Sequence, residues 1–282
     1  MVKKLLVGDV GGTNTFLGVI QGSDLLKVKE FKTKNVVIYE ELSNFLDEYD
    51  VKGVSLAVAG PVINGRVSLS NVDKIISSKK LSDLVKQDVL LLNDFEALGF
   101  FVKDKTSKGL VIGAGTGLGK VVVSDKVMGT EGGGVDFPFF SGEENIKDFF
   151  SKKLKRHPSY EDLVSGRGLS MLKQYYVKKN RVLSNNFSPS DIFSNNKDVV
   201  NKKVIKDFSK FYGRFVKNSS LELLPDKVFI AGGIARKNPE IIKSEEFLNE
   251  LSVLSKKPRV SLIKDKYAGL KGAASAFFHK NI

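Results

Sequence analysis

The chain of 282 residues is long enough for two domains of about 100 to 150 residues each, and its 41% hydrophobic content is ordinary for a globular protein. The absence of Cys excludes disulfides, thiolate zinc sites and Cys nucleophiles, and two His are too few for a His-rich metal site. The net charge of +13 comes from 38 Lys and only 7 Arg, scattered along the chain, whereas Arg is the residue that reads base edges. We therefore expect small-molecule partners and no nucleic acid.

The N-terminal segment carries no recognisable targeting or membrane signal. The apolar run after Lys3 and Lys4 is interrupted by Asp9, so it does not read as a signal peptide. No window approaches the about 18 consecutive apolar residues that a membrane-spanning helix needs. We expect a cytoplasmic protein with no membrane contact.

A first candidate site lies in the turn between two predicted strands within residues 4–20, K-L-L-V-G-D-V-G-G-T-N-T-F-L-G-V-I. The pair Gly11-Gly12 permits a tight turn. At its tip Asp9, the two glycine amides and the Thr13 hydroxyl could hold a hydrated Mg²⁺ and the oxygens of a phosphate. For this segment alone, a plain Gly-Gly hairpin is the alternative.

The following residues predict the rest of a first α/β lobe. In order they predict a strand over 25–32, a helix over 36–49, a strand over 54–59, a hairpin over 62–70 about Asn64-Gly65, a short helix over 81–86, a strand over 89–92 and a helix over 94–102. Asn93 and Asp94 stand where the apolar strand 89–92 ends, and ligands bind at the carboxyl ends of such strands. Both are site candidates, although Asp94 could instead cap the following helix.

A second Gly-rich turn repeats the first device within residues 109–123, G-L-V-I-G-A-G-T-G-L-G-K-V-V-V. It is not a P-loop, because Ala114 stands where a Gly is required and Val121 stands where Ser or Thr is required; the dinucleotide fingerprint would need Gly at Leu118. Two phosphate-type hairpins in tandem are typical of the actin/hexokinase/heat-shock-70 ATPase superfamily, which the sequence resembles at both places.

The remainder predicts a second, larger lobe. It contains a Gly-rich loop over 130–138, helices over 143–154, 160–164, 168–179 and 198–224, a strand within 228–235 that ends in Gly232-Gly233, a strand over 259–263 and a helix over 269–280. The polar stretch 103–108 separates the lobes. We predict a small α/β lobe over residues 1–104, joined by the C-terminal helix 270–282, and a large α/β lobe over residues 105–269.

Seven motifs extend the resemblance over nearly the whole chain and point to the bacterial-type glucokinase family. In family order they are L-V-G-D-V-G-G-T-N (6–14), A-V-A-G-P-V (57–62), L-L-N-D-F-E-A-L (91–98), G-A-G-T-G-L-G (113–119), E-G-G-G-V-D-F (131–137), L-V-S-G-R-G-L (163–169) and I-A-G-G-I (230–234). The resemblance implies a two-lobed actin-like ATPase (ribonuclease H-like) fold, in which each lobe is a mixed sheet flanked by helices and the active site lies in the cleft.

The resemblance also assigns roles to residues. The ATP phosphates would be bound by Asp9, Gly11, Gly12, Thr13, Asn14, Gly115, Thr116 and Gly117. Asp9 would hold Mg²⁺ through water, and Gly232 and Gly233 would approach the adenosine.

The chemistry of sugar phosphorylation fits the carboxylates of the sequence. A sugar hydroxyl that attacks the γ-phosphoryl group needs a carboxylate to accept its proton, and we assign this role to Asp94. Asn93, Glu131 and Glu161 would accept or donate hydrogen bonds to the sugar, together with Asp94. The Glu161 assignment follows the family, in which a Glu lies five residues before the glycine at 166. A turn carboxylate at Glu131 and a first-turn helix charge at Glu161 are the simpler alternatives.

The expected activity is ATP- and Mg²⁺-dependent phosphorylation of the primary hydroxyl of a hexose, most simply glucose to glucose 6-phosphate, by a protein that could form a homodimer. Two departures bear on the sugar: Gly134 stands where the family has His, and residues 70–74, S-N-V-D-K, replace a Thr-Asn-x-x-Trp segment. The alternatives are a kinase for another hexose or amino sugar, a non-catalytic sugar sensor and a filament-forming actin-like protein. A sensor should have lost Asp94 or Asp9, and a filament needs no sugar carboxylates.

Overall fold

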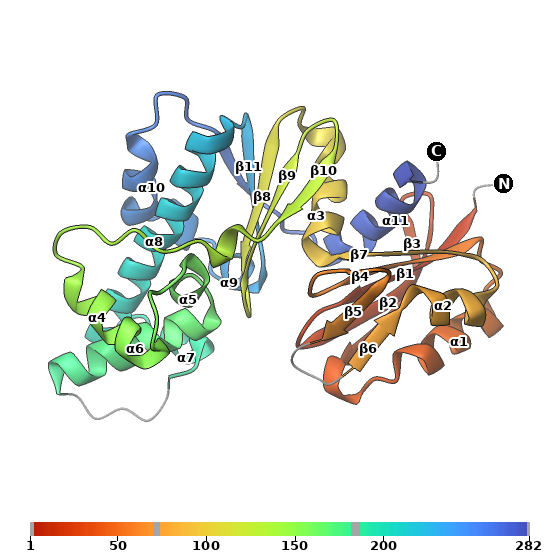
Figure 1. Ribbon diagram of the computed structural model, residues 1–282, viewed down its shortest axis with the longest axis horizontal. Coiled ribbons are helices and arrows are strands. Elements are labelled where there is room, and N and C mark those ends of the chain that lie inside the picture. The colour runs from red at the N-terminus through yellow and green to blue at the C-terminus, as the bar shows by residue number, and fades with distance from the viewer. Residues whose placement is uncertain (1–2, 70–73, 182–186, 281–282) are drawn as a thin grey trace. The chain divides into compact units, whose positions relative to one another are not determined.

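The apolar runs of the sequence form two five-stranded sheets in the computed structural model, which describes residues 3–69, 74–181 and 187–280 (Figure 1). Contacts within the chain define two compact units. The first contains Met1–Ser107, Val121–Gly129 and Asp265–Ile282, and the second contains Lys108–Lys120 and Thr130–Lys264.

The sheet of the first unit has the strand order β3-β2-β1-β4-β7. Its strands are β1 (Lys4–Val10), β2 (Asn14–Gln21), β3 (Asp24–Lys32), β4 (Gly53–Val58) and β7 (Asp88–Asn93). The first three pair antiparallel, whereas β1, β4 and β7 pair in parallel, so the sheet is mixed.

Helices cover both faces of this sheet because successive side chains of a strand point to opposite sides. Leu6 and Val10 of β1 belong to the core formed with α1 (Ile38–Glu48) and α2 (Ser78–Val85). Leu5 and Val7 belong to the core formed with α11 (Ala268–Lys280). By the same alternation, Asp9 shares the face of Leu5 and Val7.

The short elements of the first unit include η1 (Thr33–Asn35), β5 (Arg66–Leu69), β6 (Lys74–Ser77), α3 (Asp94–Val102) and η2 (Lys103–Lys105). Asn64 (φ 51°) and Gly65 (φ 68°) form the predicted two-residue turn, with a bridge between Ile63 and Arg66. The predicted hairpin over 62–70 is wrong in its extent, because the strand that pairs with β5 is β6. Residue 70 lies outside the described residues.

The second sheet has the strand order β10-β9-β8-β11-β12. Its strands are β8 (Gly109–Ala114), β9 (Leu118–Val123), β10 (Val127–Thr130), β11 (Lys227–Ala231) and β12 (Arg259–Leu262). β8, β11 and β12 are parallel, and the sequence did not predict β10. The expected α/β class, with mixed sheets flanked by helices, is confirmed.

Apart from its share of this sheet, the second unit is mostly helical. It contains η3 (Gly132–Gly134), α4 (Glu144–Leu154), α5 (Tyr160–Leu163), α6 (Gly166–Asn180), α7 (Pro189–Ser194), α8 (Val199–Leu223), α9 (Gly233–Lys237), η4 (Ile241–Lys243) and α10 (Glu245–Ser252). The sequence did not predict the short helices α7, α9 and α10.

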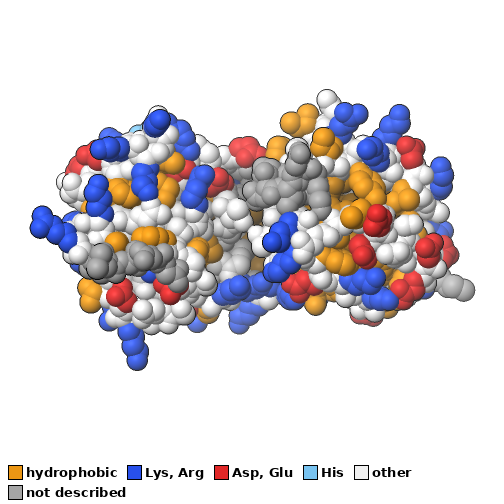
Figure 2. All heavy atoms as spheres, turned by 90° about the horizontal axis from the view of Figure 1, so that it is seen from below, with side chains coloured by type: hydrophobic (Ala, Val, Ile, Leu, Met, Phe, Trp, Pro, Cys, Tyr) orange, Lys and Arg blue, Asp and Glu red, His pale blue; other side chains and the backbone are white. Residues whose placement is uncertain are grey.

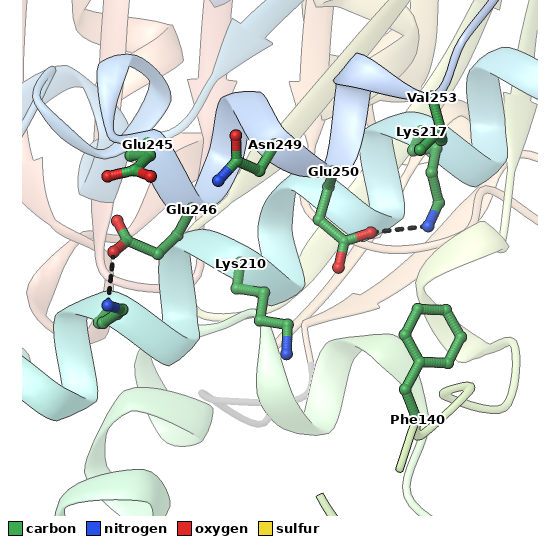
Figure 3. A pocket seen from close by; sticks show the side chains of 9 residues that line it. Phe140, Lys210, Lys217, Glu245, Glu246, Asn249, Glu250 and Val253 are labelled. Atoms are coloured by element: carbon green, nitrogen blue, oxygen red, sulfur yellow. Dashed lines mark hydrogen bonds and ion pairs between the residues drawn. The ribbon is translucent and has the colours of Figure 1, made fainter. Parts of the chain in front are cut away.

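A buried ion network ties α8 to its neighbours. The guanidinium of Arg214 is fully buried and donates to Glu143 (2.7 Å) and Glu250 (2.9 Å). Beside it lies a pocket of about 470 Å³, in which Lys217 pairs with Glu250 (Figure 3). Because its charged groups largely pair with one another, we assign this pocket a structural role. On the face drawn in Figure 2, Lys and Arg side chains are scattered among acidic ones.

The close packing of α3 on α11 should be sensitive to a single methyl group at Gly272, which would lie 1.8 Å from the carbonyl oxygen of Ala97. Gly→Ala inside a helix normally stabilises by up to about 1 kcal/mol. We expect Gly272→Ala instead to destabilise the protein by about 1–3 kcal/mol through overpacking, measured by calorimetry. Gly233→Ala, whose methyl meets nothing within 4 Å, is the control. An unchanged melting temperature for Gly272→Ala would contradict the close contact.

Candidate active site

The turn after β1 is held in place by Thr33, a residue that the sequence did not indicate. The amide of Gly11 donates to the carbonyl of Asn14 (3.0 Å), which forms the tight turn. Thr33, at the end of the hairpin, donates from its hydroxyl to the carbonyl of Gly11 (2.7 Å) and from its amide to the carbonyl of Thr13 (3.0 Å). The side-chain oxygen of Asn14 accepts from Lys32 (2.9 Å). The loop that contains Gly11, Gly12 and Thr13 is therefore fixed by Lys32 and Thr33, at the end of β3.

Asp9 lies in β1 just before this loop, and its carboxylate packs against the first turn of α11. A methyl group on Gly269 would lie 2.1 Å from Oδ2 of Asp9, so only glycine fits there. Burial raises the pKa of Asp9 to about 6. Gly269 lies in the first turn of α11, and the N-terminal end of a helix favours a nearby negative charge. Gly269 therefore admits the Asp9 carboxylate to the helix end, a role that the sequence did not indicate.

Asn93 and Asp94 lie at the same edge of the sheet as Asp9 because of the strand register. Val10 pairs with Val58, and Val58 pairs with Asn93, so Asp94 follows at the carboxyl end of the parallel strands. Burial, reinforced by the charge of Asp9, raises the pKa of Asp94 to about 7.

The helix cap of α3 is Asn93, which corrects the alternative assignment of that role to Asp94. The Asn93 oxygen accepts from the amide of Phe95 (2.8 Å), and its nitrogen donates to the carbonyl of Gly60 (3.0 Å). The Asn93 side chain also hydrogen-bonds the carboxylate of Asp94. Asp94 is the first helical residue, and its oxygen also accepts from Phe95 (3.0 Å).

The second Gly-rich turn, Gly115 to Gly117, is closed on itself and held by α6. The amide of Gly115 donates to the carbonyl of Gly117 (2.8 Å), and its carbonyl accepts from the amide of Gly166 (2.8 Å). Thr116 at the tip is exposed. Gly232 (φ 88°) lies beside this turn, because a methyl group on it would be 2.4 Å from the carbonyl oxygen of Ala114. Gly233, the next residue, begins α9.

The loop that starts at Glu131 packs directly on β9. A methyl group on Gly133 would lie 2.2 Å from the carbonyl oxygen of Leu118, and one on Gly132 would lie 2.5 Å from Cε of Lys120. Glu131 itself is exposed, and Gly134 has open space around it, with nothing within 4 Å of a built methyl group. The buried side chain of Lys120 packs against this loop at Gly132, a contact that the sequence did not indicate.

Glu161 lies in the first turn of α5, as the alternative interpretation of a first-turn helix charge expected. Its carboxylate nevertheless has a specific partner. Oε2 accepts from the amide of Leu118 (3.0 Å), the residue after the second Gly-rich turn. Next to it Asp162 is fully buried and accepts from Arg156 (2.6 Å) and Arg167 (2.8 Å).

The structure thus brings the candidate residues together within each unit. Asp9 and Asp94 influence one another in the first unit, whereas Glu161, the turn 115–117 and the loop after Glu131 meet in the second. Residues 70–73 lie outside the described part of the chain. Within the described residues there is no group of three or more His, Asp or Glu side chains that could hold a metal alone. None of the described helices is long and apolar enough to cross a membrane.

In sequence and in fold, the chain is similar to known glucokinases. The glucokinase of Erwinia tasmaniensis is 30% identical over 278 residues, which cover 88% of this chain and 86% of that protein. A glucokinase from Balamuthia mandrillaris in complex with glucose has a TM-score of 0.82 at 21% identity and covers 96% of this chain and 92% of its own. A ROK family glucokinase from Streptomyces griseus in complex with glucose and AMPPNP has a TM-score of 0.71 at 17% identity, covering 97% and 98% of the two chains.

The fold is therefore the one shared by sugar kinases of known structure. The glucokinase family model matches residues 6–280. The chain belongs to the glucokinase family, which confirms the resemblance inferred from the seven motifs.

The raised pKa values predict a characteristic pH dependence of stability. Because folding raises the pKa of Asp94 to about 7, the folded state holds more protons than the unfolded state from about pH 4 to 7, and stability falls as the pH rises through that range. We expect Asp94→Asn to match the wild type near pH 4 and to be more stable by about 1–3 kcal/mol at pH 8. Denaturant unfolding at several pH values, without nucleotide or metal, measures this difference.

The control is Asp88→Asn, at the exposed start of the same strand. It should leave the pH profile unchanged. A wild-type profile that stays flat between pH 4 and 8 would contradict the burial of the Asp94 charge.

Proposed function

We propose that this chain transfers the γ-phosphoryl group of ATP to the primary hydroxyl of a hexose, with glucose as the first candidate substrate. Membership of the glucokinase family supports the reaction class, and the relatives in complex with glucose and AMPPNP support the two substrates. The observation that carries the proposal is Asp94, a carboxylate at the edge of the first sheet whose pKa is raised to about 7. A base with a pKa near the working pH is well suited to proton transfer.

In this proposal the first unit supplies the base and its support. Asp94 accepts the proton of the attacking hydroxyl, while its hydrogen bond from the Phe95 amide (3.0 Å) fixes its orientation. The Asn93 amide, which also hydrogen-bonds the Asp94 carboxylate, would contact a neighbouring sugar hydroxyl. Its other contacts hold the end of β7 to Gly60, so the base and the sugar ligand share a rigid support.

The phosphate groups of ATP would be bound by backbone amides and hydroxyls of the two Gly-rich turns. Gly11, Gly12, Thr13 and Asn14 contribute from the first unit, and Gly115, Thr116 and Gly117 contribute from the second. Amide groups that are held in place before the reaction stabilise developing charge without reorganisation. Gly232 and Gly233 would adjoin the adenosine, where the absence of side chains permits close approach.

Asp9 fits the role of a magnesium ligand that acts through water. It is a carboxylate whose charged form is disfavoured by burial, beside a second carboxylate, and oxygen ligands are those that Mg²⁺ prefers. When bound, the ion would neutralise phosphate charge during transfer.

Sugar recognition is assigned to Glu131 and Glu161 of the second unit, together with Asn93 and Asp94. An ionised carboxylate accepts hydrogen bonds from hydroxyl groups and is a strong partner for them. The open space at Gly134 favours a second candidate, a kinase that also accepts other hexoses or amino sugars, because a family His is absent there.

The first prediction from this mechanism concerns the base. Asp94→Asn should lower kcat by about 10²- to 10⁴-fold, the usual contribution of general-base catalysis, while glucose binding survives because Asn is isosteric. ADP release measures turnover, and calorimetry measures glucose binding. Asp88→Asn, on the same strand, should retain full activity. More than about a tenth of wild-type kcat in Asp94→Asn would place the base elsewhere.

The second prediction concerns the sugar. A ring nitrogen at position 134 could bind a hydroxyl near the anomeric end, and one such neutral hydrogen bond is worth about 0.5–1.5 kcal/mol. We expect measurable turnover of mannose, 2-deoxyglucose or glucosamine beside glucose, and expect Gly134→His to narrow this preference by a few-fold to about tenfold in kcat/KM.

Gly134→Ala separates bulk from hydrogen bonding, since it fills space without a ring nitrogen. The hypothesis fails if the wild type already rejects the C2 variants by more than about a hundredfold and the His substitution changes nothing.

A further inference from the structure

Leu118 joins the turn assigned to ATP phosphates to the carboxylate assigned to the sugar. It follows Gly117 directly, and its amide donates to Oε2 of Glu161 at 3.0 Å. A methyl group on Gly117 would lie only 2.6 Å from that same oxygen. The Glu161 carboxylate is therefore hydrogen-bonded to the residue after the second Gly-rich turn and lies close to Gly117, the last residue of that turn.

The segment that carries Glu161 is attached to two loops. At its start, the amide of Tyr160 donates to the carbonyl of Val135 (2.9 Å), in the segment that follows Glu131. Beyond its end, the amide of Gly166 donates to the carbonyl of Gly115 (2.8 Å). A shift of α5 would consequently disturb both the Glu131 loop and the phosphate turn.

Asp162 prevents α5 from moving independently. Its carboxylate is fully buried and accepts from the amide of Ser159 (2.8 Å) as well as from Arg156 and Arg167. Separation of these groups would leave a buried charge without its partners, which is costly. Glu161 is thus held on a rigid turn, with Oε2 engaged by Leu118.

A carboxylate has about four acceptor positions, so a hydrogen bond to Leu118 leaves Glu161 able to accept from a sugar hydroxyl as well. We propose that Glu161 is a positioning residue for the phosphate turn in addition to a sugar ligand, and that sugar and nucleotide bind cooperatively through it within the second unit. The inference rests on the proposed function for the identity of the two ligands. Its mechanism is local: a sugar that holds the Glu161 carboxylate against the amide of Leu118 also holds the turn before it.

Coupling of this kind is reciprocal, because a ligand that strengthens a second ligand is strengthened by it to the same extent. Coupling through Glu161 therefore predicts effects on nucleotide binding that a residue acting only as a sugar ligand would not have. Removal of the Glu161 carboxylate should weaken nucleotide binding even when no sugar is present, and a disturbance of the phosphate turn should weaken sugar binding even when no nucleotide is present.

The first experiment measures ADP binding by calorimetry in the absence of sugar. Glu161→Ala should weaken ADP binding by about tenfold, since it removes a charge-assisted hydrogen bond to the turn. Glu161→Gln keeps a carbonyl acceptor for Leu118 and should retain most of the affinity. Glu131→Ala, which removes the other sugar carboxylate of this unit, should leave ADP affinity unchanged. Equal ADP affinity in Glu161→Ala and the wild type would overturn the proposal.

The second experiment measures glucose binding in the absence of nucleotide. Gly117→Ala places a methyl group against the Glu161 carboxylate and should weaken glucose binding by several-fold to about tenfold. Gly115→Ala, in the same turn, meets nothing within 4 Å and should have no effect. Equal glucose affinity in Gly117→Ala and the wild type would overturn the coupling. This pair decides the matter should Glu161→Ala not fold.

The outcomes separate this proposal from the proposed function. A wild type that phosphorylates no hexose would overturn the proposed function, whereas the ADP measurements on the Glu161 variants would still test the attachment to the turn. Normal hexose phosphorylation combined with unchanged ADP affinity in Glu161→Ala would overturn the further inference alone.

Discussion

The geometry of the candidate site depends on backbone segments that pack against one another with no side chain between them. Gly133 packs on the carbonyl of Leu118, and Gly232 packs on the carbonyl of Ala114, each so closely that a methyl group would lie within 2.4 Å of the oxygen. These contacts fix the loop after Glu131 and the end of β11 to the strands that flank the second Gly-rich turn. Here glycine supplies space rather than flexibility, so the loops are rigid although their composition suggests otherwise.

A second constraint is electrostatic and lies in the first unit. Asp9 and Asp94 are brought to one edge of the sheet by the parallel register of β1, β4 and β7, and burial raises the pKa of both. Because their charges interact, their titration belongs to the pair rather than to either residue. Burial of these charges opposes folding at neutral pH, yet the same environment makes Asp94 a better proton acceptor. The protein is therefore less stable at neutral pH because of the same carboxylate that the proposed chemistry uses as a base.

The sequence predicted the fold class and the main strands because those depend on local patterns. Apolar runs that end in glycine or in a polar pair located β1, β7 and β8, and the motif order located the family. The short helices α7 and α10 were missed because one or two turns give too few residues for a periodic pattern. The alternative that made Asp94 the helix cap was one residue late, since Asn and Asp are equally good caps and only the backbone angles distinguish Asn93 from Asp94.

Thr33, Gly269 and Lys120 support the site from positions that no local pattern reveals. Thr33 reaches the first turn only because β3 returns along β2, and Gly269 reaches Asp9 from the other end of the chain. Lys120 resembles the lysine of a P-loop in its position after glycines, but its side chain is buried beneath Gly132. Such contacts depend on tertiary packing, which the spacing of residues in one sequence does not encode.

The adjacent acids Glu161 and Asp162 show how the fold divides two similar side chains between different tasks. A helix of four residues is not stable by itself, and neighbouring residues on it point about 100° apart. Asp162 therefore points inward, where Ser159 caps the helix and two arginines neutralise the charge. Glu161, about 100° away around the same helix, accepts from the amide of Leu118. The position of Glu161, a sugar ligand only by proposal, thus depends on a neighbour that the sequence did not indicate, and the buried Asp162 anchors the helix that carries the half-buried Glu161.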